Sequence, residues 1–443
     1  MANSRATSPR RLAYTALQRI ERDQAYSDLV LAALLKQSSL DTRDRAFIND
    51  LVRGTVCWKN RLNFIVDQLF SGKELPNEIR WLLWLALYQI DYMNVPDHAA
   101  VNEAVDLTRS LKFARWSGVV NGILRNYQRH PERIQYPGRK QNPIAYISVR
   151  FSHPAWLVER WLQQWGFDKT IALCESNNQI PPLCVRVNTE KIAPKDFKVL
   201  LEKKMPDACE SVLSDYYRLQ NIQVDMLHAW LDKGWITVQD ESAGLIGLAI
   251  NPEPGMMIFD ACAAPGGKSM HLAELSGNRA QILSADLQKQ RTGLIALAAK
   301  RLDHSSVVPL VADANHIPIK QADVILLDAP CSGLGVLRRK PDMRWRRTLE
   351  EMQQLPVLQT NLLTSAAKHV KIGGHLVYST CTIDPHENEN VIKTFLESHK
   401  NYELESFDDD FWKPFLSYDG YIRTWPDIHG MDGSFLAKLK RTA

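Results

Sequence analysis

The feature that most constrains this fold is an alternation of apolar segments with amphipathic helical segments from residue 251 onward. The apolar segments, such as "GMMIFDAC" and "ADVILLDAP", are apolar on both faces of a strand. Such strands are typical of a parallel sheet that helices cover on both sides. The sequence therefore predicts a C-terminal α/β, Rossmann-like domain over residues 251–443. We expect its strands within residues 255–262, 280–287, 306–313, 322–330 and 374–381.

The first 140 residues carry a helical period instead. The segment 10–22 places Leu12, Ala16 and Ile20 on one helix face, and similar spacing recurs as far as residue 129. Strand signals are scarce, so we predict an all-α domain over residues 1–140. Residues 1–150 hold 22 Lys+Arg against 14 Asp+Glu, a balance of +8, whereas the remainder has a balance of −4. This asymmetry suits contact with a polyanion, and an ordinary solvated helical surface would give the same balance.

The region between these two parts has a mixed pattern. Residues 136–143 contain two prolines and a glycine without an apolar period, which indicates a linker. Residues 181–189 are rich in strand formers, and residues 194–204 read as a helix. We predict a helical connector and a small α+β domain over residues 141–250. Further along the chain, Pro356 is expected to bend or break a long helix over residues 349–370.

Composition excludes several classes of protein. No apolar run in the 443 residues approaches the ~20 needed to span a bilayer, and no apolar run follows the basic N-terminus as a secretory signal requires. The seven cysteines form no CxxC pair, which argues against a metal site or a disulfide framework. We therefore expect a cytoplasmic monomer that binds no metal and no membrane.

In a parallel sheet, ligands bind beyond the carboxyl ends of the strands. The first strand ends in "DACAAPGGKS", residues 260–269, where Pro265, Gly266 and Gly267 predict a tight turn close to a ligand. A Walker A loop would need glycine where Cys262 stands, and the GxGxxG pattern is missing as well. The sequence therefore disfavours nucleoside triphosphates and dinucleotides.

Acidic residues and two cysteines follow the later strands. Asp286 stands at the end of the second strand, about 20 residues after the glycine-rich turn, and suits a grip on ribose hydroxyls. Asp313 and Asp328 end the third and fourth strands. Each of these aspartates taken alone is more often a helix cap or turn former. Cys331 and Cys381 follow adjacent predicted strands; a single such cysteine is usually a small packing residue, but the pair points to a reactive site.

These segments resemble a known family. "DACAAPGGKS", "DAPCSGLGVLRRKPDMRW" and "STCTIDPHENENVI" are similar to signature segments of the RNA 5-methylcytosine methyltransferases, and "AYSDLVLAALL", "RDRAFINDLVRGTVCW" and "VPDHAAVNEAV" resemble a NusB-like RNA-binding domain. The resemblance spans nearly the whole chain. It implies S-adenosyl-L-methionine as the methyl donor and a cytosine of small-subunit ribosomal RNA as the target. One departure is Ser434, where the family's pattern has a bulky aromatic residue.

The resemblance also assigns a donor site, with the loop along the donor, Asp286 on its ribose, Asp313 near its adenine and Asp328 between donor and target base. The donor-binding residues would be Cys262, Ala263, Ala264, Pro265, Gly266, Gly267, Lys268, Asp286, Arg291, Asp313 and Asp328.

The chemistry of C5 methylation requires a thiolate. C5 of cytosine becomes nucleophilic only after a sulfur adds to C6, and a second group must then remove the C5 proton. A Pro-Cys motif supplies the nucleophile in the DNA enzymes, whereas the RNA family uses the Thr-Cys motif. The resemblance therefore makes Cys381 the nucleophile and Cys331 the group that assists release. Asp328 and Lys268 would hold the edge of the base.

A basic segment follows Cys331. Residues 338–347, "RRKPDMRWRR", hold six basic residues and one tryptophan, a mixture that suits phosphate contacts and base stacking. The predicted RNA-binding residues are Arg338, Arg339, Lys340, Arg344, Trp345, Arg346 and Arg347. A surface loop with solvated charges would have the same composition.

Two other functions are compatible with parts of the sequence. An RNA-binding or antitermination factor would keep the NusB-like half beside a non-catalytic Rossmann-like half, but it would need neither the two cysteines nor the glycine-rich loop. An amino-group methyltransferase would carry [DN]PP[YF] after the fourth strand, and "DAPC" departs from that motif.

Overall fold

A computed structural model describes residues 8–443, so the first seven residues of the predicted domain 1–140 lie outside the described residues. The chain divides into two compact units. The helical unit contains Met1–Ile180 together with Leu337–Arg346, and the α/β unit contains Pro181–Val336 with Arg347–Ala443. The chain therefore leaves the α/β unit after Val336 and returns to it at Arg347.

The helical unit has no strand among its described residues, in agreement with the all-α prediction. Its helices are α1 (Pro9–Arg22), α2 (Ser27–Lys36), α3 (Thr42–Leu69), α4 (Asn77–Tyr92), α5 (Asp97–Ser110), α6 (Ser117–Arg129), α7 (Pro143–Arg150), α8 (Ala155–Asn178) and the short α14 (Met343–Arg346). The predicted face of α1 is confirmed, since Ala13, Ala16, Leu17 and Ile20 are buried.

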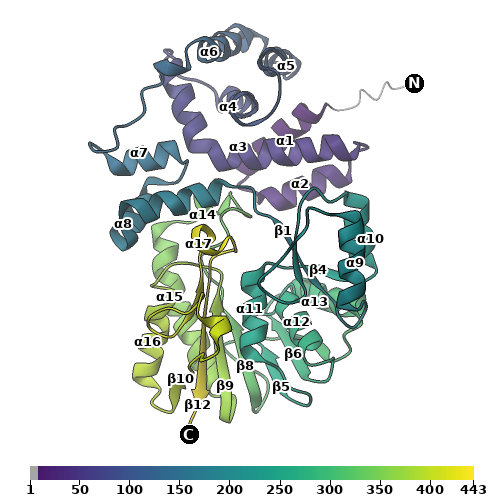
Figure 1. Cartoon of the computed structure of the whole chain (residues 1–443). Coiled ribbons are helices and arrows are strands. Elements are labelled where there is room, and N and C mark those ends of the chain that lie inside the picture. The colour runs from purple at the N-terminus through teal and green to yellow at the C-terminus, as the bar shows by residue number, and fades with distance from the viewer. Residues whose placement is uncertain (1–7) are drawn as a thin grey trace. The chain divides into compact units, whose positions relative to one another are not determined.

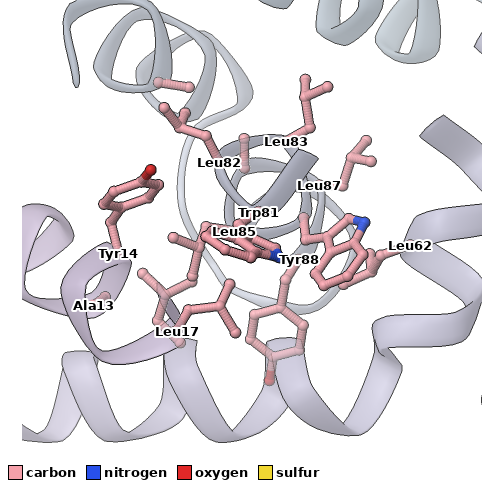
Figure 2. Close-up of a cluster of buried hydrophobic side chains, with 14 of the residues drawn as sticks. Ala13, Tyr14, Leu17, Leu62, Trp81, Leu82, Leu83, Leu85, Leu87 and Tyr88 are labelled. Carbon is pink, nitrogen blue, oxygen red and sulfur yellow. The ribbon is translucent and has the colours of Figure 1, made fainter. Parts of the chain in front are cut away.

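Helix α4 forms the centre of the helical core (Figures 1 and 2). It is apolar around its whole circumference and buries every residue from Trp81 to Gln89. It contacts α1, α3, α5 and α6, and Tyr14 and Leu17 of α1 belong to the same buried cluster as Trp81 and Leu85 (Figure 2). A helix that is hydrophobic on all sides is stable only when other helices enclose it, which explains this arrangement.

The α/β unit begins with a small α+β part. Its four-stranded antiparallel sheet has the order β2-β3-β1-β4. The elements are β1 (Leu183–Val187), α9 (Pro194–Lys204), β2 (Cys209–Glu210), β3 (Tyr216–Leu219), α10 (Val224–Asp232) and β4 (Ile236–Val238). Helix α9 has the predicted limits, with Pro194 in its first turn where a missing N–H costs nothing.

The rest of the α/β unit is built around one eight-stranded sheet, whose order is β10-β12-β9-β8-β5-β6-β7 with β11 paired to β12. Five strands are parallel to their neighbours, as predicted, and β10, β11 and β12 are antiparallel. The strands are β5 (Met257–Asp260), β6 (Gln281–Asp286), β7 (Val307–Val311), β8 (Ala322–Asp328), β9 (Val370–Thr380), β10 (Tyr402–Leu404), β11 (Ile422–Thr424) and β12 (Ser434–Arg441).

Helices cover both faces of this sheet (Figure 1). The helices are α11 (Glu241–Ile250), α12 (Gly267–Leu275), α13 (Lys289–Leu302), α15 (Leu349–Ala367), α16 (Glu389–Ser398) and α17 (Pro426–His429). Along β8 the side chains alternate between two cores: Val324 and Leu326 share one with α12 and α13, whereas Ile325 and Leu327 share the other with α15 and α16. This alternation is why both faces of the strand had to be apolar.

Pro356 does not break the long helix around it. Helix α15 continues as one helix on both sides of the proline, and the alternative of a bend stays a prediction. The helix is fixed by packing before and after the proline, because Met352 and Leu363 are both buried. Tertiary packing of this kind offsets the hydrogen bond that proline removes.

Candidate active site

The glycine-rich loop connects β5 to α12 at the carboxyl edge of the sheet. Gly266 has φ +104°, a conformation that residues with a side chain rarely adopt, and it is the N-cap of α12. Ala263 and Ala264 are buried in the loop. Ser269, in the first turn of α12, donates to the Oδ2 atom of Asp260 at 2.6 Å and so joins the helix to the strand end. The structure confirms the predicted tight turn.

Arg291 links this loop to the second strand end. Its Nη2 atom donates to the carbonyl oxygen of Ala264 at 2.9 Å, and its Nη1 atom lies 3.4 Å from Asp286 Oδ2. Asp286 is almost fully buried and also accepts from the backbone N–H of Gln288 at 3.0 Å. The ends of β5 and β6, which are neighbours in the sheet, therefore form one connected group.

Lys268 and Asp328 form an ion pair between the loop and the end of β8. Lys268 Nζ lies 2.6 Å from Asp328 Oδ2, and Ser379 of β9 donates to Asp328 Oδ1 at 2.8 Å. Burial alone would lower the pKa of Lys268, but the charge and hydrogen bond of Asp328 outweigh it and raise that pKa. Lys268 is therefore a fixed cation in this site.

Three carboxylates gather around Cys262. Burial raises the pKa of its thiol to about 12, and the charges of Asp260, Asp328 and Asp286 add to the effect. Cys262 is therefore a neutral thiol, which suits a lining residue and not a nucleophile. Burial also raises the pKa of Asp260 to about 7, and its Oδ1 atom has no hydrogen-bond partner in the structure.

Asp313 follows β7 and lies in a turn of its own. It accepts from the backbone N–H of Asn315 at 2.9 Å and from the side chain of the same residue at 3.0 Å. The backbone hydrogen bond lowers the pKa of Asp313. These contacts are those of a turn-forming aspartate. Its predicted place near the donor's adenine stays a prediction.

The two cysteines lie at the ends of adjacent strands. β8 and β9 are parallel neighbours with Asp328 opposite Ser379, so Cys331 and Cys381 emerge at the same edge of the sheet. Their Sγ atoms are 3.3 Å apart. A hydrogen bond to Cys381, followed by burial, raises the pKa of Cys331 well above its usual value. The Cys331 thiol therefore keeps its proton at neutral pH.

Part of the predicted RNA-binding segment is buried in the helical unit. Arg344 has no exposed surface; its guanidinium group donates to the carbonyl oxygens of Ser152 (3.2 Å) and Asn177 (3.0 Å) and to Asn178 Oδ1 (2.7 Å). Asn177 and Asn178 end α8, where unpaired carbonyl groups favour a cation. Trp345 donates from Nε1 to the carbonyl oxygen of Val56 at 2.7 Å. Arg344 and Trp345 therefore hold the segment in the helical core, and their predicted contacts with RNA stay predictions.

The other predicted RNA contacts differ in exposure. Arg338 is buried and Arg339 partly buried. Arg346 lies 4.1 Å from the centre of the Tyr26 ring and 3.5 Å from Asp342. Lys340 is the one member of the set that is exposed. The sequence of a basic segment does not show whether its side chains face solvent or are enclosed by hydrogen-bond acceptors from distant segments.

Arg347, the last member of the basic run, belongs to the α/β unit. Its guanidinium donates to the carbonyl oxygens of Ser332 (2.9 Å, from Nε) and Cys331 (3.2 Å, from Nη2). It therefore holds the turn that carries Cys331, a role that the composition of the segment did not indicate.

The acidic stretch after Cys381 contains the start of the next helix. Helix α16 begins at Glu389, and Glu387 is fully buried in the loop that precedes it. Its carboxylate accepts from the backbone N–H of Ser332 at 2.8 Å. The sequence signal that could have identified Glu387 was its position a few residues after Cys381, at the end of a predicted strand.

Ser434, the departure from the family pattern, is accommodated locally. It is buried at the start of β12, and its hydroxyl lies 2.9 Å from Thr424 Oγ1 on the neighbouring β11. Among residues 8–443 no group of three His, Cys, Asp or Glu side chains could hold a metal ion, and none of the described helices is long and apolar enough to cross a membrane.

Comparison with known proteins defines the class of this chain. Residues 247–440 match the family described as 16S rRNA methyltransferase RsmB/F, and residues 7–129 match the NusB family. Residues 153–219 match the ferredoxin-like domain of RsmF/B-like methyltransferases. With the parallel sheet and its glycine-rich loop, these matches define a Rossmann-like methyltransferase that carries a NusB-like helical domain and a ferredoxin-like domain.

Relatives over the full length identify the family. The chain is 34% identical to the probable ribosomal RNA small subunit methyltransferase B of Bacillus subtilis and 37% identical to that of Synechocystis, with 98% of this chain and 99% of each relative covered. The crystal structure of PH0851 superposes with a TM-score of 0.80 at 26% identity, covering 98% of this chain and 99% of that one. The chain belongs to the ribosomal RNA small subunit methyltransferase B family.

Proposed function

We propose that this chain transfers a methyl group from S-adenosyl-L-methionine to C5 of a cytosine in small-subunit ribosomal RNA, through a covalent bond between Cys381 and C6. The observation that carries the proposal is the 3.3 Å separation of the Cys331 and Cys381 sulfurs at the ends of two adjacent parallel strands. Methylation of a nitrogen or oxygen needs no sulfur nucleophile, so this pair favours methylation of carbon. Small-subunit ribosomal RNA is named by the relatives.

The residues around the donor loop fit this donor. Its sulfonium is a cation, and the carboxylates of Asp286 and Asp328 contribute negative charge around Cys262. The carboxylate of Asp286 suits the ribose hydroxyls, because a carboxylate can accept two hydrogen bonds side by side. Arg291 contacts both Asp286 and the loop and so fixes their positions relative to each other. When bound there, S-adenosyl-L-methionine supplies the methyl group that C5 receives.

Each polar residue has a step in the proposed reaction. The Cys381 thiolate adds to C6, which makes C5 nucleophilic, while Lys268 and Asp328 hold the N3 and exocyclic-amine edge of the base. After methylation Cys331 takes the proton from C5. The electron pair of the broken C5–H bond forms the C5=C6 double bond, and the pair of the broken C6–S bond returns to Cys381.

The coupling of the two sulfurs orders these steps. In the free enzyme the hydrogen bond with Cys381, burial and the charge of the Cys381 sulfur raise the pKa of Cys331, so Cys331 keeps its proton before the reaction begins. Once the Cys381 sulfur is bonded to C6, the two effects of Cys381 disappear, while burial and the charges of Glu387 and Asp328 still raise the pKa of Cys331. That pKa is then lower than in the free enzyme, so the thiol proton can leave to water and the resulting thiolate can accept the C5 proton.

Mapping of 5-methylcytosine in small-subunit ribosomal RNA tests the proposal. RNA from a strain lacking the gene should lose one modified cytosine in bisulfite sequencing, and the wild-type gene should restore it. The Cys381→Ala variant should not restore it and should form no covalent RNA adduct, whereas Cys331→Ala should accumulate the adduct on denaturing gels. Adduct formation by Cys381→Ala, together with its loss in Cys331→Ala, would reverse the two roles.

Binding of the donor alone separates an enzyme from a passive RNA-binding scaffold. Titration calorimetry of the purified chain with S-adenosyl-L-methionine should show binding at one site, which a scaffold with an unused Rossmann-like half would lack. The target base must leave its stack to reach Cys381, so the RNA offered in these assays should contain single-stranded or loop cytosines.

A further inference from the structure

One buried carboxylate connects the two turns that carry the cysteines. Glu387 lies in the loop between β9 and α16 and has no exposed surface. Its Oε2 atom accepts from the backbone N–H of Ser332 at 2.8 Å, and its Oε1 atom accepts from the Ser332 hydroxyl. Oε1 also accepts from the Thr382 hydroxyl at 3.2 Å. Ser332 and Thr382 are the residues that follow Cys331 and Cys381.

The turn around Cys331 is held from both sides. Gln359 of α15 donates from Nε2 to Glu387 Oε2 and to the carbonyl oxygen of Pro330, both at 2.9 Å. Arg347 donates to the two carbonyl oxygens that follow, those of Cys331 and Ser332. The peptide groups on both sides of Cys331 therefore have fixed hydrogen-bond partners. Glu387 accepts hydrogen bonds from both the Ser332 N–H and the Gln359 side chain.

The charge of Glu387 matters to this arrangement. Burial raises its pKa, and the hydrogen bonds from Ser332 and Gln359 work in the opposite direction because they favour the ionised form. The Ser332 N–H can only donate, whereas the Ser332 and Thr382 hydroxyls can also accept. A neutral amide at position 387 would turn its NH2 group toward these two hydroxyls, and the turn would lose the charge-assisted hydrogen bonds that now hold it.

The Cys381 turn depends less on Glu387. Thr380 donates to Asn388 Oδ1 at 2.6 Å, and Asn388 Nδ2 donates to the carbonyl oxygen of Thr382 at 3.0 Å. The carbonyl oxygen of Cys381 itself accepts from the backbone N–H of Gly335 at 3.0 Å. Loss of the Glu387 charge should therefore displace Cys331 more than Cys381.

We propose that Glu387 is a positioning residue that holds Cys331 Sγ beside Cys381, so that Cys331 can take the C5 proton after methyl transfer. This inference rests on the proposed function and deepens it, since it assigns the control of one step. A displaced Cys331 would leave the first covalent bond intact: Cys381 would still add to C6 and C5 would still be methylated. The proton would then stay on C5, and the C6–S bond would persist.

The Glu387→Gln variant tests this assignment in the full-length chain. We expect methyl transfer in a single turnover to stay within about threefold of the wild type, and steady-state kcat to fall by about tenfold or more, because a misplaced base slows release. The KM for RNA should not rise, and a covalent adduct should accumulate on denaturing gels as in Cys331→Ala. A purely structural role would lower single-turnover and steady-state rates together.

Glu389→Gln is the matched control. Glu389 is a buried carboxylate two residues further along, and its Oε1 atom pairs with Arg423 at 2.6 Å. It makes no hydrogen bond to either cysteine turn in the structure. This variant should turn over like the wild type and accumulate no adduct.

A second variant keeps the proposal testable if Glu387→Gln folds poorly. Gln359→Met keeps the volume of the side chain and removes the donor shared by Glu387 and Pro330. It should produce the same accumulation of adduct to a smaller extent. The proposal is overturned if a folded Glu387→Gln or Gln359→Met variant releases its product at the wild-type rate, or if it loses single-turnover methylation as severely as turnover.

Failure of the proposed function would look different. The wild type and Cys331→Ala would then form no adduct with cytosine-containing RNA, whatever Glu387→Gln does. If Cys331→Ala accumulates the adduct and Glu387→Gln does not, the methylation mechanism stands and the role of Glu387 falls.

Discussion

Replacement of Glu274 by glutamine should destabilise the α/β unit by several kcal/mol. Glu274 lies on α12 and forms a buried ion pair with Arg186 of β1, with 2.7 Å between Oε2 and Nε and 2.9 Å between Oε1 and Nη2. The side chains of Arg186 and Glu274 are only 2% and 5% exposed. The Glu274→Gln substitution would leave the Arg186 cation buried without its counter-charge.

Two estimates of the magnitude agree. Burial alone would raise the pKa of Glu274, but the charge of Arg186 and the hydrogen bonds from His304 and Arg186 outweigh it and lower that pKa to about 2 from 4.5. At 1.36 kcal/mol for each pH unit, this difference corresponds to about 3 kcal/mol of stability at neutral pH. Removal of one partner from a buried ion pair typically costs about 3–5 kcal/mol.

The same numbers give a pH dependence. The pKa of Glu274 is lower in the folded chain than in the unfolded chain, so its contribution is present in full above about pH 4.5. It is lost as the pH falls toward 2, where the folded carboxylate takes up its proton. The wild type should therefore lose stability relative to Glu274→Gln across this acidic range, and the two proteins should converge.

Hydrogen exchange at increasing urea concentration measures the effect locally. Peptides from β1 and α12 should show a free energy of opening about 3 kcal/mol lower in Glu274→Gln at pH 7. The control is Glu210→Gln, which breaks an exposed ion pair with Lys198 in the same α+β part and should not change stability measurably. A loss below about 1 kcal/mol for Glu274→Gln would refute the reasoning, because it would place the pair in the range of surface ion pairs.

A consequence for the donor loop follows from the same contacts. Arg186 also donates from Nη1 to the carbonyl oxygen of Gly267 at 3.3 Å, at the start of α12. Glu274→Gln should therefore weaken donor binding in calorimetry even under conditions where the chain is folded.

Four further predictions concern the site and the helical unit. Cys381→Ala should lower the pKa of Cys331, because the hydrogen bond and charge that raise it disappear; alkylation of Cys331 followed by mass spectrometry should shift to lower pH, and an unshifted profile would contradict the coupling. Diamide should join the two sulfurs, which are 3.3 Å apart, and block methyl transfer until dithiothreitol is added; inhibition without a mapped Cys331–Cys381 disulfide would count against this. Asp286→Asn should weaken S-adenosyl-L-methionine binding by about tenfold or more in calorimetry, since a charge-assisted hydrogen bond is lost, and unchanged affinity would remove Asp286 from the donor site. Arg344→Ala should lower the unfolding free energy of the helical unit by about 2–4 kcal/mol, because three buried acceptors lose their donor; denaturation in urea checks this, and a neutral result would mean that water replaces the guanidinium.

The edge of the sheet that carries the site could be predicted from the sequence. Apolar runs that alternate with helices define a parallel sheet, and all parallel strands end at the same edge. Asp286, Asp328, Cys331 and Cys381 stand one after another at such ends, so their assembly followed once the strands were assigned. The all-α nature of the first domain was equally visible, because its helices need the apolar stripe that the sequence shows.

The partners of the polar residues could not be predicted in this way. Arg344 and Arg347 belong to one basic run, yet Arg344 is enclosed by carbonyl oxygens at the end of α8 and Arg347 holds the Cys331 turn. Glu387 looks like a helix-opening acid and is instead an acceptor for Ser332, which lies more than fifty residues earlier.

The sequence by itself determined the order of elements, the faces that are buried and the strand ends at which chemistry occurs. Hydrophobic periodicity records these properties locally, in neighbouring residues. Only the tertiary structure decided that Arg344 is enclosed in the helical unit, that Glu387 bridges the turns of Cys331 and Cys381, and that those sulfurs are in contact. The physical reason is that a buried charge is stable only where distant segments supply its hydrogen-bond partners, and no local pattern records which segments those are.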